Sequence, residues 1–129
     1  MKASLRKFER LCKKKDFQLL FKEGDFIIQH PIKAQFLFIN NNENFIKVAF
    51  AVPSRKIKKA TTRNYIKRVL RESYRKQKYV LYNCIKNCSL YVSFIFIADT
   101  PCNYSQIEKT MLSLLEEIKK NYYFHINKL

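Results

Sequence analysis

Three short stretches in the first half of the chain are rich in β-branched and aromatic residues and predict β-strands, and the third of them alternates apolar and polar positions. The stretches are residues 25–29, 32–39 and 45–52, and a polar turn at residues 40–44 separates the last two. A period of two places alternate side chains on opposite faces of a sheet. Since the three stretches are consecutive, we expect an antiparallel meander. Residues 90–98 are rich in β-branched and aromatic residues and predict a fourth strand.

Residues 16–23 show helical spacing and are expected to form the first helix. Asp16 belongs to a residue type that caps helix N-termini, and Gly24 is expected to end the helix in a left-handed conformation. The apolar face of this helix consists of Phe17, Leu20 and Phe21. Residues 1–13 are basic and lack periodicity, so we expect them to form a mobile N-terminal arm.

A second helix is expected after the third strand, with Thr62 as its capping residue. At about 100° per residue, its side chains fall into two stripes. The apolar stripe holds Ile66, Val69, Leu70, Ser73 and Tyr74. The cationic stripe holds Asn64, Lys67, Arg68, Arg71, Arg75 and Lys78. Such a helix can dock by its apolar stripe and hold positive charge in solvent.

The C-terminal part of the chain predicts one more helix. Residues 105–108, Ser-Gln-Ile-Glu, have the form of a capping box, and residues 79–89 are compatible with a helical extension. Apolar residues of the last helix recur at helical spacing: Ile107, Met111, Leu114, Leu115 and Ile118. The order α-β-β-β-α-β-α predicts a single α+β domain over residues 14–122, with helices packed on one sheet, and a tail over residues 123–129.

The composition adds a strongly cationic surface to this picture. Of the 129 residues 47% are hydrophobic, including 11 Phe and 8 Tyr, which is enough to fill a core. The net charge is +16, and residues 54–78 alone hold eleven basic residues and one acidic residue, a net charge of +10. A solvated helix face normally mixes charges, because like charges at helical spacing repel. The unmixed patch therefore indicates a polyanionic partner, nucleic acid before an acidic membrane.

Residues 54–59, Ser-Arg-Lys-Ile-Lys-Lys, add positive charge just before the second helix, where backbone N–H groups also favour an anion. Arginine can hold a phosphate through two hydrogen bonds at once. Loop and helix together suit an irregular folded RNA, although charge alone does not distinguish RNA from DNA. The chain has neither an apolar run of ~20 residues that would span a membrane nor a secretory signal at its N-terminus. We expect a cytoplasmic protein with reduced cysteines and no membrane partner.

Residues 48–75, VAFAVPSRKIKKATTRNYIKRVLRESYR, resemble the central segment of the bacterial ribonuclease P protein component. In that family a strand leads through a basic loop into a helix with an Arg-Asn-Arg motif, which reads here Arg63-Asn64-Tyr65. Residues 16–24, DFQLLFKEG, are similar to the family's first helix, and residues 94–98, FIFIA, to its last strand. The resemblance covers about residues 10–120 and matches the element order.

The resemblance implies a fold like that of domain 2 of ribosomal protein S5, in which the second helix joins two parallel strands by a left-handed crossover, an exception to the usual hand. It implies a protein subunit of ribonuclease P. The catalytic RNA of that enzyme removes the 5′ leader of precursor tRNA with Mg²⁺ bound mainly by the RNA. The protein alone is expected to be inactive, to hold no metal and to need no protein partner.

The resemblance also implies site residues. Contacts to the catalytic RNA are expected from Arg55, Lys56, Lys58, Lys59, Arg63, Asn64, Lys67, Arg68, Arg71 and Arg75. The leader is expected in a cleft between the first helix and the sheet, lined by Phe17, Phe21 and Phe36, the last with an alignment uncertainty of one residue. Aromatic side chains in a cationic groove can hold a single strand. By residue type alone, without the resemblance, the favoured role of these three phenylalanines is in the core.

Two departures from the family pattern are Tyr65 in place of the second arginine, where stacking could replace a phosphate contact, and Ser54 in place of a frequent lysine. A structural RNA-binding protein of the ribosomal type would share the charge without needing the cleft. A protein-only nuclease would need clustered carboxylates or paired histidines. The acidic residues are dispersed, and His125 is expected in the tail, away from His30. Cys84 and Cys88 lie four residues apart without further nearby ligands, which favours structural thiols over zinc.

Overall fold

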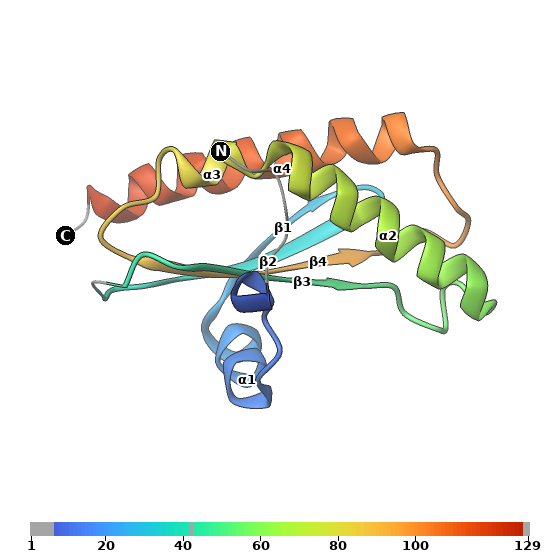
Figure 1. The fold of residues 1–129 in the computed structure, drawn as a ribbon, viewed down its shortest axis with the longest axis horizontal. Helices are drawn as coiled ribbons and strands as arrows, with labels where there is room; N and C mark the ends of the chain where they lie inside the picture. Colours follow the sequence, from blue (N-terminus) through green and yellow to red (C-terminus); the bar gives the residue numbers. More distant parts are fainter. Residues whose placement is uncertain (1–6, 42, 128–129) are drawn as a thin grey trace.

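A computed structural model describes residues 7–41 and 43–127 of the chain. Figure 1 shows a sheet in the middle, one short helix below it and the longer helices above it. The elements in chain order are the 3₁₀ turn η1 (Lys7–Glu9), α1 (Lys14–Glu23), β1 (Asp25–Gln29), β2 (Ile32–Ile39), β3 (Ile46–Ala51), α2 (Ala60–Gln77), α3 (Tyr79–Tyr82), β4 (Ser89–Phe96) and α4 (Tyr104–Ile126). The predicted α+β class and element order are confirmed.

The four strands form one sheet in the order β1-β2-β4-β3. The pairs β1–β2 and β2–β4 are antiparallel, whereas β3 and β4 are parallel. The expected meander of the first three strands is therefore wrong, because β4 lies between β2 and β3. Seven of the eight residues of β4 are buried, and a strand of this kind belongs in the interior of a sheet.

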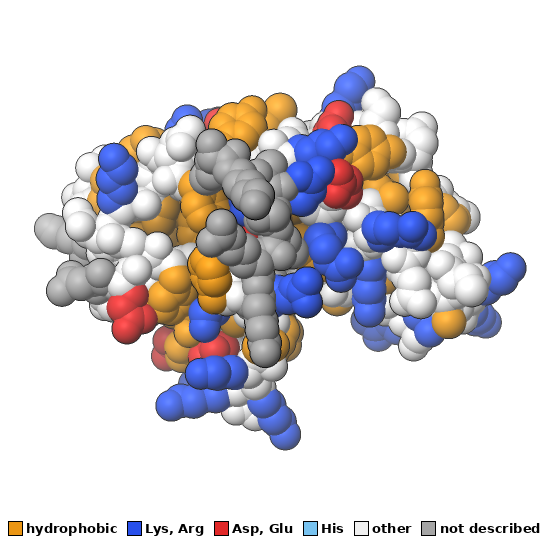
Figure 2. Space-filling view, viewed as in Figure 1, with side chains coloured by type: hydrophobic (Ala, Val, Ile, Leu, Met, Phe, Trp, Pro, Cys, Tyr) orange, Lys and Arg blue, Asp and Glu red, His pale blue; other side chains and the backbone are white. Residues whose placement is uncertain are grey.

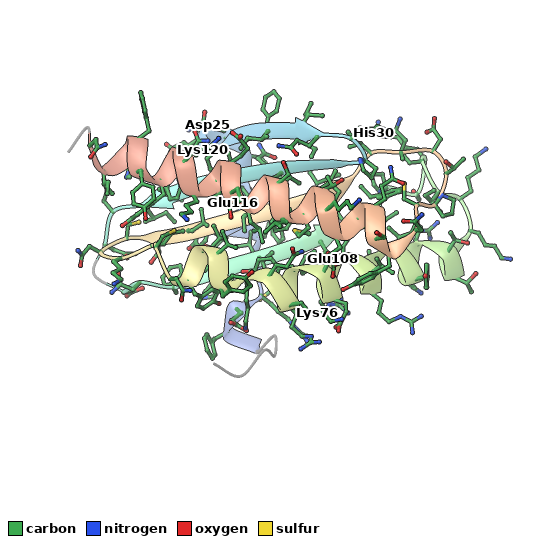
Figure 3. The ribbon with its side chains drawn as sticks, turned by 90° about the horizontal axis from the view of Figure 1, so that it is seen from above. Asp25, His30, Lys76, Glu108, Glu116 and Lys120 are labelled. Carbon is green, nitrogen blue, oxygen red and sulfur yellow. The ribbon has the colours of Figure 1, made fainter. Side chains whose placement is uncertain are left out.

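The connection from β3 to β4 runs through α2 and α3. Seen from the helix side, the chain passes from β3 to β4 in the left-handed sense (Figures 1 and 3), which is rare among parallel connections. The short helix α3 covers only the first four of residues 79–89, which the sequence left ambiguous, and Leu81 in it is fully buried.

The sheet separates a large core from a small one. The large core lies under α2 and α4, where Ala34 and Phe94 from the strands meet Leu70 and Met111 from the helices. Figure 3 shows α2 and α4 side by side over the sheet, and the Gln77 side-chain amide joins them by donating to the Glu108 carbonyl at 3.1 Å.

On the opposite face, α1 is attached through a small cluster of Leu11, Leu20 and Tyr91. Leu37 of β2 and Ala49 of β3 pack against this cluster.

Helix α1 begins at Lys14, so the expected capping role of Asp16 is wrong. Asp16 lies in the first turn instead, and its hydrogen bond with Tyr91, together with the larger effect of burial, raises the pKa of Tyr91 to about 12. Gly24 is extended, with φ −77° and ψ 155°, so the expected left-handed turn is also wrong. A Cβ at Gly24 would lie 2.4 Å from the Leu20 carbonyl oxygen and 2.9 Å from that of Phe36. Glycine is needed here for close approach of α1 to β2.

Helix α2 begins at Ala60, two residues before the predicted cap Thr62. Lys59 occupies the capping position, and its side chain makes no capping hydrogen bond. The predicted apolar stripe is confirmed, because all five of its members are buried: Ile66, Val69, Leu70, Ser73 and Tyr74.

Helix α4 is capped by Asn103, whose side chain accepts a hydrogen bond from the Gln106 amide at 2.8 Å. The predicted capping box starting at Ser105 is therefore wrong. The helix continues to Ile126, so the expected tail does not begin at residue 123, and His125 stacks on Phe38 at 5.3 Å. The predicted apolar positions of this helix are all buried. None of the helices in the described ranges is long and apolar enough to cross a membrane.

The expected mobile arm is wrong for residues 9–11, whereas residues 1–6 of it lie outside the described residues. Glu9 and Leu11 are buried, and Arg10 forms a parallel bridge with Val48 of β3. The Leu11 amide donates to the Val48 carbonyl at 2.9 Å. Single bridges of this kind leave no periodic pattern in the sequence, because their partners are distant in the chain.

Candidate nucleic-acid interface

One face of α2 carries cationic side chains that point away from the sheet. Arg68 and Arg71 are exposed and Lys67 is half-buried, while Ile66 and Leu70 are fully buried. Figure 2 shows Lys and Arg side chains gathered over the α2 side of the molecule. The buried stripe fixes the helix on the sheet, so these charges stand on a rigid support.

The loop before α2 is fixed to both the core and the helix. The side chain of Ile57 is buried, and its amide donates to the Pro53 carbonyl at 3.2 Å. Arg63 Nη1 donates to the carbonyl oxygens of Ile57 and Lys58 at 3.0 and 2.8 Å. Arg63 therefore holds the loop against the first turn of α2, a role that the sequence did not predict. Lys56, also a predicted contact, is half-buried. The remaining predicted contact residues of this region are exposed: Arg55, Lys58, Lys59 and Asn64.

Residues 55–59 and the exposed side of α2 together form a cationic surface. Within the part of the chain that the structure describes, its ion pairs with acidic side chains lie at its two ends. Lys56 Nζ lies 3.4 Å from a carboxylate oxygen of Asp99, and Arg75 is hydrogen-bonded to Glu72. That hydrogen bond is the largest cause of a lowered pKa at Glu72 and a raised pKa at Arg75. Within the described ranges, the ion pairs do not include Arg63, Arg68 or Arg71.

Lys78 does not belong to the cationic surface, and its place in the predicted stripe is wrong. It is 3% exposed and lies 2.9 Å from a carboxylate oxygen of Glu9. The helical wheel missed this because α2 ends at Gln77 and a new turn, α3, begins at Tyr79.

Tyr65 occupies the motif position where the resemblance implies an arginine. Its side chain is exposed, and the guanidinium carbon of Arg68 lies 5.8 Å from the centre of its ring. At this distance the cation and the ring attract each other. The substitution thus removes one charge and adds an exposed aromatic face beside a retained arginine.

A cleft of about 260 Å³ lies beside the cationic surface. Its walls come from the N-terminal segment, α1, β3 and α2. The lining residues are Arg10, Leu11, Cys12, Phe17, Val48, Ala49, Phe50 and Arg71. The cleft therefore combines aromatic rings with two arginines and opens next to the helix that bears the positive charge.

The three predicted cleft phenylalanines do not lie together. Phe17 and Phe21 of α1 contact each other with ring centroids 5.9 Å apart, and Phe21 is 55% exposed. Phe36 is buried in the large core and packs on Phe38 at 5.7 Å, on the sheet face opposite α1. Its assignment to the cleft is therefore wrong. A shift of one residue reverses the face of a strand position, and Leu37, the next residue, packs against the small core under α1.

The sequence also gave no reason to select the exposed side chains of β1. Phe26 and Ile28 are 59% and 55% exposed, opposite Gln35 and Lys33 of β2. Since Ile27 and Ala34 face the large core, these side chains lie on the α1 face of the sheet. Lys33 Nζ sits 4.7 Å above the Phe26 ring. Because side chains alternate between the two faces of a strand, these exposed residues could have been identified once the buried face of β2 was known.

The described residues bring together no group of three or more His, Cys, Asp or Glu that could hold a metal ion. The four cysteines are free thiols: Cys12, Cys84, Cys88 and Cys102. Burial raises the pKa of the Cys84, Cys88 and Cys102 thiols, so these three are protonated at neutral pH.

Comparison with known proteins gives consistent matches. The family described as Ribonuclease P matches residues 5–119. A ribonuclease P protein component of Alkaliphilus oremlandii is 31% identical over 123 residues, covering 88% of this chain and 94% of the relative. That of Porphyromonas gingivalis is 25% identical over 120 residues, covering 91% and 88%. The solved RNase P protein of Thermotoga maritima has a TM-score of 0.65 at 27% identity and covers 84% of this chain and 96% of that one. The solved RNase P protein of Staphylococcus aureus has the same fold, with a TM-score of 0.63 at 24% identity. The match covers 88% of this chain and 97% of that one.

Proposed function

The chain belongs to the bacterial ribonuclease P protein family, and from this membership we propose that the cationic surface of α2 and its preceding loop binds the catalytic RNA. As a protein component, the chain is a subunit of the ribonuclease P holoenzyme, which cleaves tRNA precursors. The observation that carries the proposal is the exposure of Arg68 and Arg71 on a helix whose other face is buried.

Arginine forks on this helix bind phosphates of the folded RNA through paired hydrogen bonds. Arg63 contributes charge and holds the loop, so that Lys58 and Lys59 meet the same RNA surface. Beside them, the exposed ring of Tyr65 stacks on an unpaired base, with Arg68 alongside. Each neutralised phosphate releases counterions, so binding weakens as salt rises.

The 5′ leader of precursor tRNA lies in the cleft beside α1. Phe17 and Phe21 offer ring faces, and Arg10 and Arg71 offer charge for the backbone of a single strand.

Mg²⁺, where the holoenzyme uses it, would be bound mainly by the RNA subunit. The side chains of the proposed interface are mostly Lys and Arg, which repel a divalent cation instead of coordinating it. When bound by the RNA, Mg²⁺ supplies the charge stabilisation for phosphodiester cleavage. This chain's part is to neutralise phosphates and to hold the leader, and its place of action is the bacterial cytoplasm.

Reconstitution tests the proposal. At a low Mg²⁺ concentration, adding the protein to a bacterial ribonuclease P RNA should restore cleavage of precursor tRNA, and the protein alone should leave the substrate intact. Cleavage by the protein alone would indicate a protein nuclease. Tight binding without stimulation would indicate a structural RNA-binding protein.

A further inference from the structure

A buried polar cluster ties the N-terminal segment to the junction of α2 and α3. Lys78 Nζ donates to Glu9 Oε1 at 2.9 Å, and both side chains are 4% exposed. The Tyr82 hydroxyl donates to the same carboxylate oxygen, and Lys78 Nζ lies 5.2 Å from the centre of the Tyr82 ring. Lys78 is also fixed through its backbone, because its carbonyl accepts from the Leu81 and Tyr82 amides at 3.0 and 3.1 Å.

This cluster lies next to a backbone contact that has little stability of its own. The residue after Glu9, Arg10, forms an isolated parallel bridge with Val48, and the Leu11 amide donates to the Val48 carbonyl. A bridge of one residue pair cannot specify its own register. A slip by one residue would exchange the side chains of Arg10 and Leu11, which face opposite ways.

Burying an ion pair gives little net stability compared with apolar side chains of similar size, but it accepts only one geometry. We propose that Glu9, Lys78 and Tyr82 are positioning residues that lock the register of residues 10–12 against β3 and so build one wall of the leader cleft. The wall residues are those that line the cleft from the N-terminal side: Arg10, Leu11 and Cys12. In Figure 1 the chain after the first turn, η1, leads from the sheet down to α1.

The consequence for RNA binding rests on the proposed function. With the wall fixed, Arg10 and Phe17 face the same cleft before the RNA arrives, and binding does not have to order the segment. Without the lock, the segment samples several registers and the leader loses this preformed wall. The exposed arginines of α2 are unaffected, since their support is the large core.

The test uses a triple variant that replaces the whole cluster by apolar side chains, Glu9→Leu/Lys78→Met/Tyr82→Phe. Its free energy of unfolding should stay near that of the wild type, because no charge and no hydroxyl of the cluster is left without its partner. Amide hydrogen exchange of Leu11 should accelerate ~10-fold or more, since this amide reports the bridge to Val48. The preference for leader-bearing over leaderless tRNA should fall ~5-fold, with unchanged affinity for the RNA subunit.

A matched control is Glu117→Leu/Lys120→Met, which removes an ion pair on the surface of α4 and should change neither readout. If the charge-free variant fails to fold, Tyr82→Phe decides, because it removes only the hydroxyl that donates to Glu9 and should accelerate Leu11 exchange in the same direction. If the Leu11 amide of a folded variant exchanges at the wild-type rate, the proposed register lock is wrong. Fast exchange with an intact leader preference would overturn its role in the cleft. If the wild-type protein binds no precursor tRNA, the proposed function fails. The exchange rate of Leu11 still shows whether the cluster fixes the register of residues 10–12.

Discussion

Residues that look alike in the sequence of α2 differ in what they do. Arg63 and Arg68 belong to the same motif, but Arg63 donates to two loop carbonyls whereas Arg68 is exposed beside Tyr65. Lys78 continues the cationic stripe by spacing, yet it is buried against Glu9. Helical spacing predicts the direction of a side chain, but its partners depend on segments far away in the sequence.

Tyr65 provides a test at this scale that separates stacking from charge. Tyr65→Leu should lower affinity for the RNA subunit ~5-fold or more, since stacking on a base contributes ~1–3 kcal/mol. The slope of log affinity against log salt should not change, because no phosphate contact is lost. Tyr65→Phe should bind like the wild type. Full affinity of Tyr65→Leu in a filter-binding titration would exclude the stacking role.

Tyr65→Arg tests the complementary point. The added guanidinium should restore a phosphate contact and steepen the salt slope by about 0.7–0.9. An unchanged slope would show that this position of α2 does not face a phosphate in the complex.

Substitutions of Phe21 and Phe36 should have different effects, the first on RNA binding and the second on stability. Phe21→Ala should leave stability nearly unchanged and weaken binding of leader-bearing tRNA selectively, because this ring is 55% exposed on α1. Phe36→Ala should cost about 3–5 kcal/mol of unfolding free energy, because the ring is buried in the large core. Urea denaturation and tRNA titrations of both variants check this. A stable Phe36→Ala protein with a selective leader defect would contradict the assignment of Phe36 to the core.

At the scale of elements, the sequence predicted the strands and the buried stripes well, but it predicted the helix starts poorly. The positions of strands and of buried helix faces follow from which residues are buried at regular intervals, and the spacing of apolar residues in the sequence shows this directly. The starts of α1 and α2 were misplaced because lysines, Lys13 and Lys59, occupy the capping positions without a capping hydrogen bond, so residue type does not mark them. At α4, both Asn103 and Ser105 are capping residue types, and the sequence alone does not choose between them. Where a helix starts also depends on tertiary contacts, such as the Arg63 contacts with the loop.

The cap of α4 allows a direct comparison of the predicted and the observed residue. Asn103→Ala should lower the free energy of unfolding by about 1 kcal/mol, because its side chain accepts from the Gln106 amide. Ser105→Ala should change it by less than about 0.5 kcal/mol, since Ser105 is an exposed position inside the helix. Thermal unfolding of the two variants measures the difference. Equal losses would show that Asn103 is not the cap that matters.

At the scale of the whole molecule, the order of the strands could not be derived from alternation alone. Consecutive strands usually pair, so the residues favoured a meander, whereas the family resemblance implied the parallel pair through α2. The insertion of β4 between β2 and β3 follows from its burial on both faces, which becomes informative only when the other elements are placed. The cleft could not be derived from local pattern either. Its N-terminal wall depends on how residues 10–12 pair with β3, and the exclusion of Phe36 from it depends on the register of β2.

The central claim is that one face of α2, and not net charge, binds the catalytic RNA. The most direct measurement compares the RNA-subunit affinity of two variants with the same loss of charge, Arg68→Ala/Arg71→Ala on α2 and Lys86→Ala/Lys120→Ala elsewhere on the surface. We predict that the first loses ~10-fold or more in affinity and about 1.4–1.8 from its salt slope, and that the second loses far less. Equal losses in the two variants would contradict the account.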